Sequence, residues 1–301
     1  MQAGLSRNHH TVPEFFLRRF LEPGEQKLNE YFKPRGEWRR TSPSSATVDR
    51  DANLYGYSED ELSDDFEKEF SRIETLVSPV IANVSRDRPP SEYEREGLAS
   101  FVSLQLLRGR MMRAVWSNAK AAYERPESSL RILDECKEKL ITEFGIEEYE
   151  SRRREILESG KGLRLPTGFG LDHLPRMHPR LGAVLSRMEW RLEIAAQGEH
   201  FVVSDNPVVP TSRFRHDADW VFALCREDLG IEVTCPLDPR TCLVCSWENR
   251  FKWSVRASKT RVQEINRRTA FAALKSVYGG KISSHSRAII EQVRTRVLRV
   301  L

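Results

Sequence analysis

Cysteine is scarce in this chain, which has five among 301 residues. An odd count in a chain without an apolar N-terminal leader favours reduced thiols over a disulfide framework. No window of the sequence approaches the roughly 18 uninterrupted apolar residues of a membrane-spanning helix. We therefore expect a cytoplasmic protein that does not cross a membrane.

The short motifs that signal several common chemistries are also absent. The sequence contains no GxxxxGK phosphate loop, no GxGxxG fingerprint, no GxSxG elbow and no HExxH pair. These absences argue against P-loop NTPases, dinucleotide-dependent dehydrogenases, α/β-hydrolases and zinc proteases. Cys242 and Cys245 have the spacing of half a zinc knuckle, but they lie in an expected strand. Because residues three apart on a strand face opposite sides, we expect buried apolar thiols there and no zinc.

Charge is nearly balanced overall but unevenly distributed along the sequence. The net charge is +4, from 48 Lys and Arg and 44 Asp and Glu. Residues 58–85 carry eight acidic side chains, whereas residues 250–301 carry thirteen Lys and Arg against Glu264 and Glu291. A basic C-terminal region can contact the phosphates of a nucleic acid, or it can neutralise the acidic segment within the fold. We favour the second interpretation and keep a nucleic-acid partner as the alternative.

Helical periodicity dominates the middle of the sequence. Apolar residues recur there at three- and four-residue steps, which is typical of helices. We expect one long helix from Ser58 to about Val84, capped by Ser58 with Glu61, and a second from about Ser91 to Tyr123. These two helices are expected to form an antiparallel hairpin, followed by one or two charged helices over 128–158.

Strand-like segments flank this helical region on both sides. Residues 28–33 and 37–41 predict a hairpin. In the second half, strands are predicted at 188–197, 199–204, 220–225, 231–236 and 241–247, and helices at 260–278 and 284–300. The fold class is therefore α+β, with a mainly antiparallel sheet built from the N-terminal and C-terminal segments. We expect a single domain over residues 1–301, with a helical insertion at about 58–158.

The tetrapeptide Ser204-Asp205-Asn206-Pro207 directly follows an apolar run that we expect to end a buried strand. Asp and Asn before Pro are common turn formers, so a simple turn is one interpretation. A carboxylate and an amide at a strand end are also well placed to hold a ligand. His10, near the N-terminus, is a second candidate, because a neutral imidazole can bind a metal or act as a general base. The alternative for His10 is a histidine that fills an interface.

Glu67 and Glu74 are seven residues apart, so they share one face of the first long helix. A carboxylate that faces inward needs a partner, and Arg108 lies near the apolar stripe of the second helix. One interpretation is therefore an ion pair between Glu74 and Arg108. The other places Glu74 with His10 and Asp205 around a divalent cation, because mixed carboxylate and imidazole ligands suit Mg²⁺ or Mn²⁺ better than structural zinc.

Three further candidates lie on the helix expected over residues 260–278. Asn266, Arg267 and Arg268 are adjacent, and the two arginines can bind a phosphate group of a substrate. The alternative interpretation is an exposed basic helix face, which we favour.

Several of these segments together resemble a known family, the domain-of-unknown-function family 4238. His10-Thr11-Val12-Pro13 is similar to its His-x-Val-Pro motif, and Ser204-Asp205-Asn206-Pro207 to its Ser/Thr-Asp-Asn-Pro motif. The likeness spans about residues 8–280 and implies a mostly bacterial protein, although it brings no established activity. It favours treating five polar residues as one set: His10, Glu74, Arg108, Asp205 and Asn206.

Two functional hypotheses from different classes follow from these residues. The first is a metal-dependent phosphodiester hydrolase similar to a nuclease, in which His10, Glu74 and Asp205 hold the metal and activate water. Arg108 or Arg267 would then stabilise the charge of the phosphate. The second is a non-catalytic binding or interaction protein, in which the same polar residues form a buried network that locks the helical layer to the sheet. The spatial arrangement of the three proposed metal ligands separates the two hypotheses.

Overall fold

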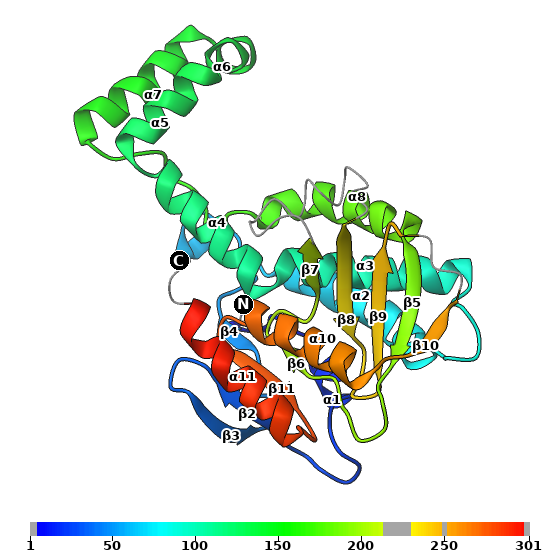
Figure 1. Ribbon diagram of the computed structural model, residues 1–301. Helices are drawn as coiled ribbons and strands as arrows, with labels where there is room; N and C mark the ends of the chain where they lie inside the picture. Colours follow the sequence, from blue (N-terminus) through cyan, green and yellow to red (C-terminus); the bar gives the residue numbers. More distant parts are fainter. Residues whose placement is uncertain (1–4, 213–229, 249–251, 298–301) are drawn as a thin grey trace.

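The computed structural model describes residues 5–212, 230–248 and 252–297 (Figure 1). The fold is α+β, as predicted, with most helices in the middle of the chain and sheets built from both ends. The strand predicted at 220–225 lies outside the described residues. Within the described residues, no helix is long and apolar enough to cross a bilayer.

A four-stranded antiparallel sheet joins the two ends of the sequence. Its strands, in spatial order, are β3 (Glu37–Thr41), β2 (Leu28–Phe32), β11 (Ser276–Gly279) and β6 (Val203–Ser204). The predicted hairpin is confirmed as β2 and β3, in which Leu28 pairs with Thr41. Because β11 lies between β2 and β6, the second edge of β2 in the N-terminal hairpin is paired by a C-terminal strand.

The strand β11 corrects the prediction of one helix over 260–278. Helix α10 (Lys259–Ala272) ends early, and the chain continues in extended form. The backbone N–H groups of residues 274–276 all donate to the carboxylate of Asp205. Those N–H groups are therefore not available for helical hydrogen bonds. The helix after it, α11 (Ser284–Val297), is confirmed.

A five-stranded sheet forms the other β layer, and all its pairs are antiparallel except β10 with β5. Its strands, in spatial order, are β10 (Ser254–Arg256), β5 (Glu189–Ile194), β9 (Thr241–Ser246), β8 (Ile231–Pro236) and β7 (Val209–Ser212). A separate two-stranded ladder pairs β1 (Asn8–His10) with β4 (Val48–Arg50). Residues 52–57 form only isolated bridges, Tyr55 with Ser63 and Gly56 with Thr167.

Alternate residues of β9 enter two different core layers. Leu243 and Cys245 belong to the main apolar cluster with helices of the middle segment, whereas Cys242 and Val244 pack with residues of α10. The two cysteines therefore point to opposite faces, as strand alternation predicted. Burial raises the pKa of the Cys245 thiol above its ordinary value, so this side chain behaves as a buried apolar group.

The main core contains residues of α2 (Asp65–Ala82), α3 (Glu92–Arg108) and α8 (Leu174–Arg187), and the short α1 (Glu14–Arg18) adds Phe16 and Leu17. The predicted pairing of the first two is confirmed, but α2 begins at Asp65. Ser58 instead precedes a short 3₁₀ turn and makes no side-chain capping bond. The second predicted helix is broken at Gly109, and its remainder is α4 (Arg110–Tyr123). Helix α8 was missed by the sequence analysis, although its buried Leu174, Leu181, Val184 and Leu185 follow helical spacing.

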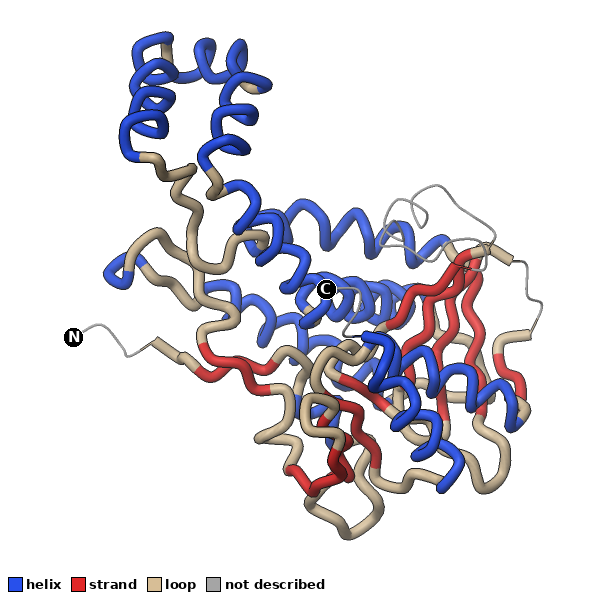
Figure 2. Tube along the Cα trace, turned by 60° about the vertical axis from the view of Figure 1, so that its left-hand side comes forward, coloured by secondary structure: helices blue, strands red, loops and turns tan. Residues whose placement is uncertain are grey.

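Three short helices project from the body at the end of α4, as Figures 1 and 2 both show. They are α5 (Pro126–Glu135), α6 (Lys137–Phe144) and α7 (Ile146–Ser159), where we expected one or two. Their contact surface is a small cluster around Leu133, Tyr149 and Ile156, separate from the main core. We refer to these three helices as the helical arm.

The N-terminus of α3 gives a testable pH dependence. Ser91 and Glu94 form a complete capping box, and Arg88 donates two hydrogen bonds to the same carboxylate. Bonds to Arg88 and Ser91 lower the pKa of Glu94 to about 2, from an ordinary 4.5. Because the folded pKa is depressed, its stabilising effect is full above about pH 4.5 and is lost as pH falls toward about 2.

We expect Glu94→Gln to lower the free energy of unfolding near neutral pH, and the difference from wild type to shrink as the pH is lowered below about 4.5. Urea titrations at several pH values measure this difference. The exposed Glu96, on the same helix, supplies the matched control Glu96→Gln. A Glu94→Gln difference that is constant with pH would contradict the assignment.

Candidate functional site

Four of the five polar candidates, Glu74, Arg108, Asp205 and Asn206, lie with their partners in two groups at the break between α3 and α4. Gly109 leaves the helical path with a ψ of 157°, so the neighbouring arginines reach different partners. We refer to the first group as the clamp, which contains Asp49, Arg110, Asp205, Asn206 and Lys275. We refer to the second as the arginine network, which contains His9, Asn53, Glu67, Glu74, Arg108 and Arg113.

Asp205 is the centre of the clamp and is fully buried. Its carboxylate accepts backbone N–H bonds from Leu274 at 3.0 Å, Lys275 at 2.6 Å and Ser276 at 3.3 Å. Arg110 Nη1 donates a fourth bond at 3.1 Å. Burial raises the pKa of Asp205, while Arg110 and the backbone donors act in the opposite direction. Both carboxylate oxygens are therefore engaged inside the protein.

Arg110 connects this carboxylate to a second one. Its Nε and Nη2 atoms donate to the two oxygens of Asp49 at 2.6 and 2.9 Å, which is the bidentate geometry of a strong pair. Lys275 Nζ donates to Asp49 at 3.0 Å. Burial alone would raise the pKa of Asp49, but Arg110 and Lys275 hold it below its ordinary value. Two carboxylates and two cations thus balance each other within the clamp.

Asn206 joins two helix ends. Its Oδ1 accepts the N–H of Met111 at 2.9 Å in the first turn of α4, and its Nδ2 donates to the carbonyl of Ala272 at 2.8 Å. A Cβ atom at Gly109 would lie 2.7 Å from that Oδ1. The break in the predicted 91–123 helix follows from this contact, because Asn206 supplies the acceptor for the N–H groups of a new helix start.

Glu74 and Arg108 form the ion pair that one interpretation of the sequence predicted. Glu74 Oε1 lies 2.5 Å from Arg108 Nη2. The Arg108 side chain is 1% exposed and that of Glu74 is 21% exposed, so only the carboxylate reaches solvent. Arg108 also lies over the ring of Phe70, 5.3 Å from its centre.

Arg113 extends the arginine network toward the N-terminus. Its Nε donates to the carbonyl of Arg108 at 2.8 Å, and its terminal nitrogens donate to the carbonyl of Ala52 and to Oδ1 of Asn53. Asn53 in turn donates through its side chain to Glu67, and through its backbone N–H to His9 Nδ1 at 3.0 Å. Glu67 thus lies in the same network as Glu74, on the shared helix face that their spacing predicted.

His9 is the fully buried histidine of the N-terminal pair, although the sequence analysis selected His10. His10 is partly buried, and its Nδ1 has no hydrogen-bond partner among the residues that the structure describes. Neighbouring side chains on a strand face opposite sides. The sequence alone did not indicate which side of β1 is buried.

The structure does not gather the three candidates on α10 into one surface. Asn266 is fully buried, accepts the N–H of Val202 at 3.0 Å and donates to the carbonyl of His200 at 2.9 Å. Arg268 pairs with Glu232 at 2.6 Å and also with Glu264. Arg267 is exposed. Of the three, Arg267 is the exposed residue, whereas the paired Arg268 side chain is 21% exposed.

The proposed metal ligands have separate partners. Asp205 pairs with Arg110 in the clamp, and Glu74 pairs with Arg108 in the arginine network. His10 belongs to neither group. In the described ranges, no group of three or more His, Cys, Asp and Glu side chains is arranged to hold a metal ion. Among the described residues, the structure therefore does not gather His10, Glu74 and Asp205 into one set of ligands, and the proposed Mg²⁺ or Mn²⁺ site stays a prediction.

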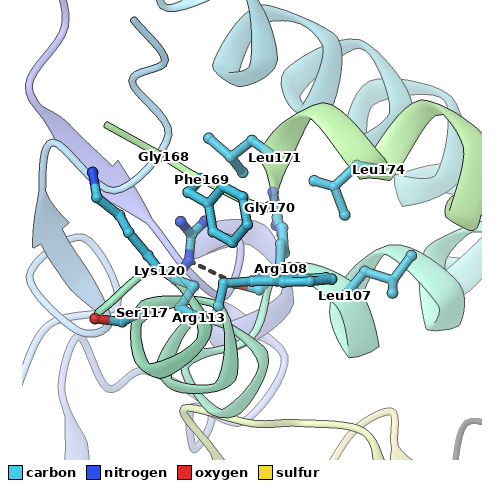
Figure 3. A pocket seen from close by; sticks show the side chains of 11 residues that line it. Leu107, Arg108, Arg113, Ser117, Lys120, Gly168, Phe169, Gly170, Leu171 and Leu174 are labelled. Carbon is cyan, nitrogen blue, oxygen red and sulfur yellow. Dashed lines mark hydrogen bonds between the residues drawn. The ribbon is translucent and has the colours of Figure 1, made fainter. Parts of the chain in front are cut away.

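A partly enclosed cavity of about 170 Å³ lies beside the arginine network (Figure 3). Helix α4 supplies Arg113, Trp116, Ser117 and Lys120, whose spacing of three, four and seven residues places them on one face. The remaining lining residues come from the end of α3 and from the segment that leads into α8: Leu107, Arg108, Gly168, Phe169, Gly170, Leu171 and Leu174.

This cavity was not predicted from the sequence. The sequence signal for it is the basic and aromatic face of α4, together with the glycines between residues 160 and 170. Gly170 has a φ of 100°, and a Cβ atom there would lie 2.3 Å from the indole ring of Trp116. Glycine is therefore required both by the backbone conformation and by close packing.

Comparison with curated proteins and with solved structures returned no match to this chain. A comparison with family models matched residues 8–283 to the model described as "Protein of unknown function (DUF4238)". The matched range includes the clamp, the arginine network, the helical arm and the cavity. Because this match covers most of the sequence, the chain belongs to the DUF4238 family, as its resemblance to that family predicted.

Proposed function

We propose that this chain is a non-catalytic binding protein, whose motif residues hold the helical layer against the sheets. The observation that supports this proposal is the environment of Asp205, whose oxygens accept from three backbone N–H groups and Arg110. A general base or a metal ligand needs a lone pair that faces a substrate or an ion. Two other carboxylates of these groups are also paired with arginines, Asp49 with Arg110 and Glu74 with Arg108.

A nucleic acid is the alternative partner, as part of the phosphodiester hydrolase hypothesis. The exposed Arg267 on α10 and the basic composition of residues 250–301 support this second proposal. We also propose a cytoplasmic location, which the free thiols of Cys235, Cys242 and Cys245 support.

Incubation with plasmid DNA and with RNA, in Mg²⁺ or Mn²⁺, separates the two proposals. We expect no cleavage by the wild-type chain beyond that of a preparation from cells lacking it. Cleavage that requires the added metal and is lost in Glu74→Gln would support the hydrolase instead. Glu69→Gln, an exposed change on the same helix, is the matched control.

A further inference from the structure

We propose that the cavity between α4 and residues 168–174 binds a small aromatic anion, a single ring that carries a carboxylate or a phosphate (Figure 3). The inference deepens the proposed binding function by naming a ligand class. It rests on that function only in assuming that the ligand is bound and not turned over.

The size of the cavity limits the ligand to about one ring. Its volume is about 170 Å³. An engineered protein cavity of about 150 Å³ accommodates benzene, whereas sites for drug-sized molecules occupy roughly 300–1,000 Å³. A ring with one charged substituent therefore matches the available space, since the cavity is partly open and the substituent can extend toward its rim.

Aromatic and aliphatic side chains form the apolar part of the wall. Trp116 and Phe169 meet edge to face, with ring centres 6.3 Å apart and an interplanar angle of 90°. Leu107 and Leu174 complete this apolar surface. The indole Nε1 of Trp116 is buried and has no hydrogen-bond partner within the described part of the chain. A ring in the cavity gains contact with these aromatic neighbours.

The charged part of the wall is entirely cationic. Arg108, Arg113 and Lys120 line the cavity, and no Asp or Glu is among its lining residues. Glu74 already compensates Arg108 from outside the cavity. Lys120 Nζ donates to the carbonyls of Leu165 and Pro166, at 3.0 and 2.8 Å, and it pairs at 3.6 Å with Glu124, which does not line the cavity. An anion is therefore favoured over a neutral or cationic ring.

Arg113 adds a specific reason to expect an anion. All its hydrogen bonds go to uncharged oxygens, those of Arg108, Ala52 and Asn53. Burial and the nearby Arg108 lower the pKa of Arg113 to about 10. A bound carboxylate or phosphate would offset the cost of burying this guanidinium charge.

Calorimetric titration of the full chain with benzoate and with phenyl phosphate tests the proposal, with benzyl alcohol as the uncharged control. We expect one of the anions to bind about tenfold or more tightly than benzyl alcohol, as one charge-assisted hydrogen bond predicts. Binding of benzoate alone would assign a carboxylate ligand, and binding of phenyl phosphate alone a phosphate ligand. Lys120→Met is expected to weaken the anion about tenfold, whereas Lys139→Met, at an exposed position on the helical arm, leaves it unchanged.

Lys120→Met also removes the hydrogen bonds to the carbonyls of Leu165 and Pro166, so a second variant tests the cavity without touching that loop. Ser117 is exposed at the cavity and makes no side-chain bond in the described structure, so Ser117→Trp fills the opening without removing a contact. We expect it to abolish binding while leaving the melting temperature unchanged. Unchanged binding in folded Ser117→Trp, equal binding of benzyl alcohol, or no binding of either anion at about 10 mM would overturn the proposal. Nuclease activity would overturn the proposed function but would leave this binding result unaffected.

Discussion

We expect Asp205→Asn to lower the free energy of unfolding by about 3–5 kcal/mol, although the side chain keeps its size. The amide retains one acceptor oxygen and places an NH₂ group where N–H donors now converge. Lys275 N–H and Arg110 Nη1 both donate to Asp205 Oδ2, and Leu274 N–H donates to Oδ1. An NH₂ group in place of either oxygen therefore leaves at least one buried donor unpaired. The substitution also removes the negative charge that balances Arg110. Urea denaturation measures the loss.

Asp238 supplies a matched control for this prediction. Its carboxylate also accepts backbone N–H bonds, from Arg240 at 2.7 Å and Thr241 at 2.8 Å, and it pairs with Arg19. Its side chain is 24% exposed, so water can replace lost bonds. We expect Asp238→Asn to cost only about 1 kcal/mol. If both variants are equally stable, or if Asp205→Asn loses an activity without losing stability, the structural role of the clamp is wrong.

The clamp also explains which parts of the fold could be predicted from the sequence. The α+β class, the hairpin and the α2–α3 pairing depend on local periodicity, which the sequence displays directly. The break at Gly109 and the early end of α10 depend on Asn206 and Asp205, which lie 95 residues from Met111 and 69 residues from Leu274. Both segments have helical patterns, and a distant side chain overrides them. A contact with a residue so far away in the sequence leaves no periodic pattern at the helix end from which it could be predicted.

The candidate site also has features that could be predicted from local sequence and features that depend on distant contacts. The Glu74–Arg108 pair could be predicted because both residues border apolar stripes of neighbouring helices. The choice between His9 and His10 could not be made, since it depends on which face of β1 is covered. The cavity was missed because its two walls, α4 and the segment before α8, are separated by the whole helical arm. They meet only in the folded chain (Figures 1 and 3).

The Glu74–Arg108 pair provides the second large effect, and the two partners are expected to respond unequally. Glu74→Leu leaves Arg108, which is 1% exposed, as a buried cation without its carboxylate. We expect a loss of about 3–5 kcal/mol in unfolding free energy. Arg108→Met leaves a carboxylate that is 21% exposed and can be hydrated, so a smaller loss of about 1–3 kcal/mol is expected. Glu69→Leu, in an exposed pair with Arg72 on the same helix, is expected to cost less than about 1 kcal/mol.

The double variant Glu74→Leu with Arg108→Met then gives the decisive comparison. Neither side chain carries a charge, and methionine and leucine are apolar side chains that can fill the space between α2 and α3. Replacing a buried pair by apolar residues is often neutral, whereas removing one partner is not. We therefore expect the double variant to be more stable than Glu74→Leu alone, with a coupling energy of about 0.5–3 kcal/mol in a double-mutant cycle. Additive losses would mean that the two residues act independently, and Glu74 would again be free to serve as a ligand.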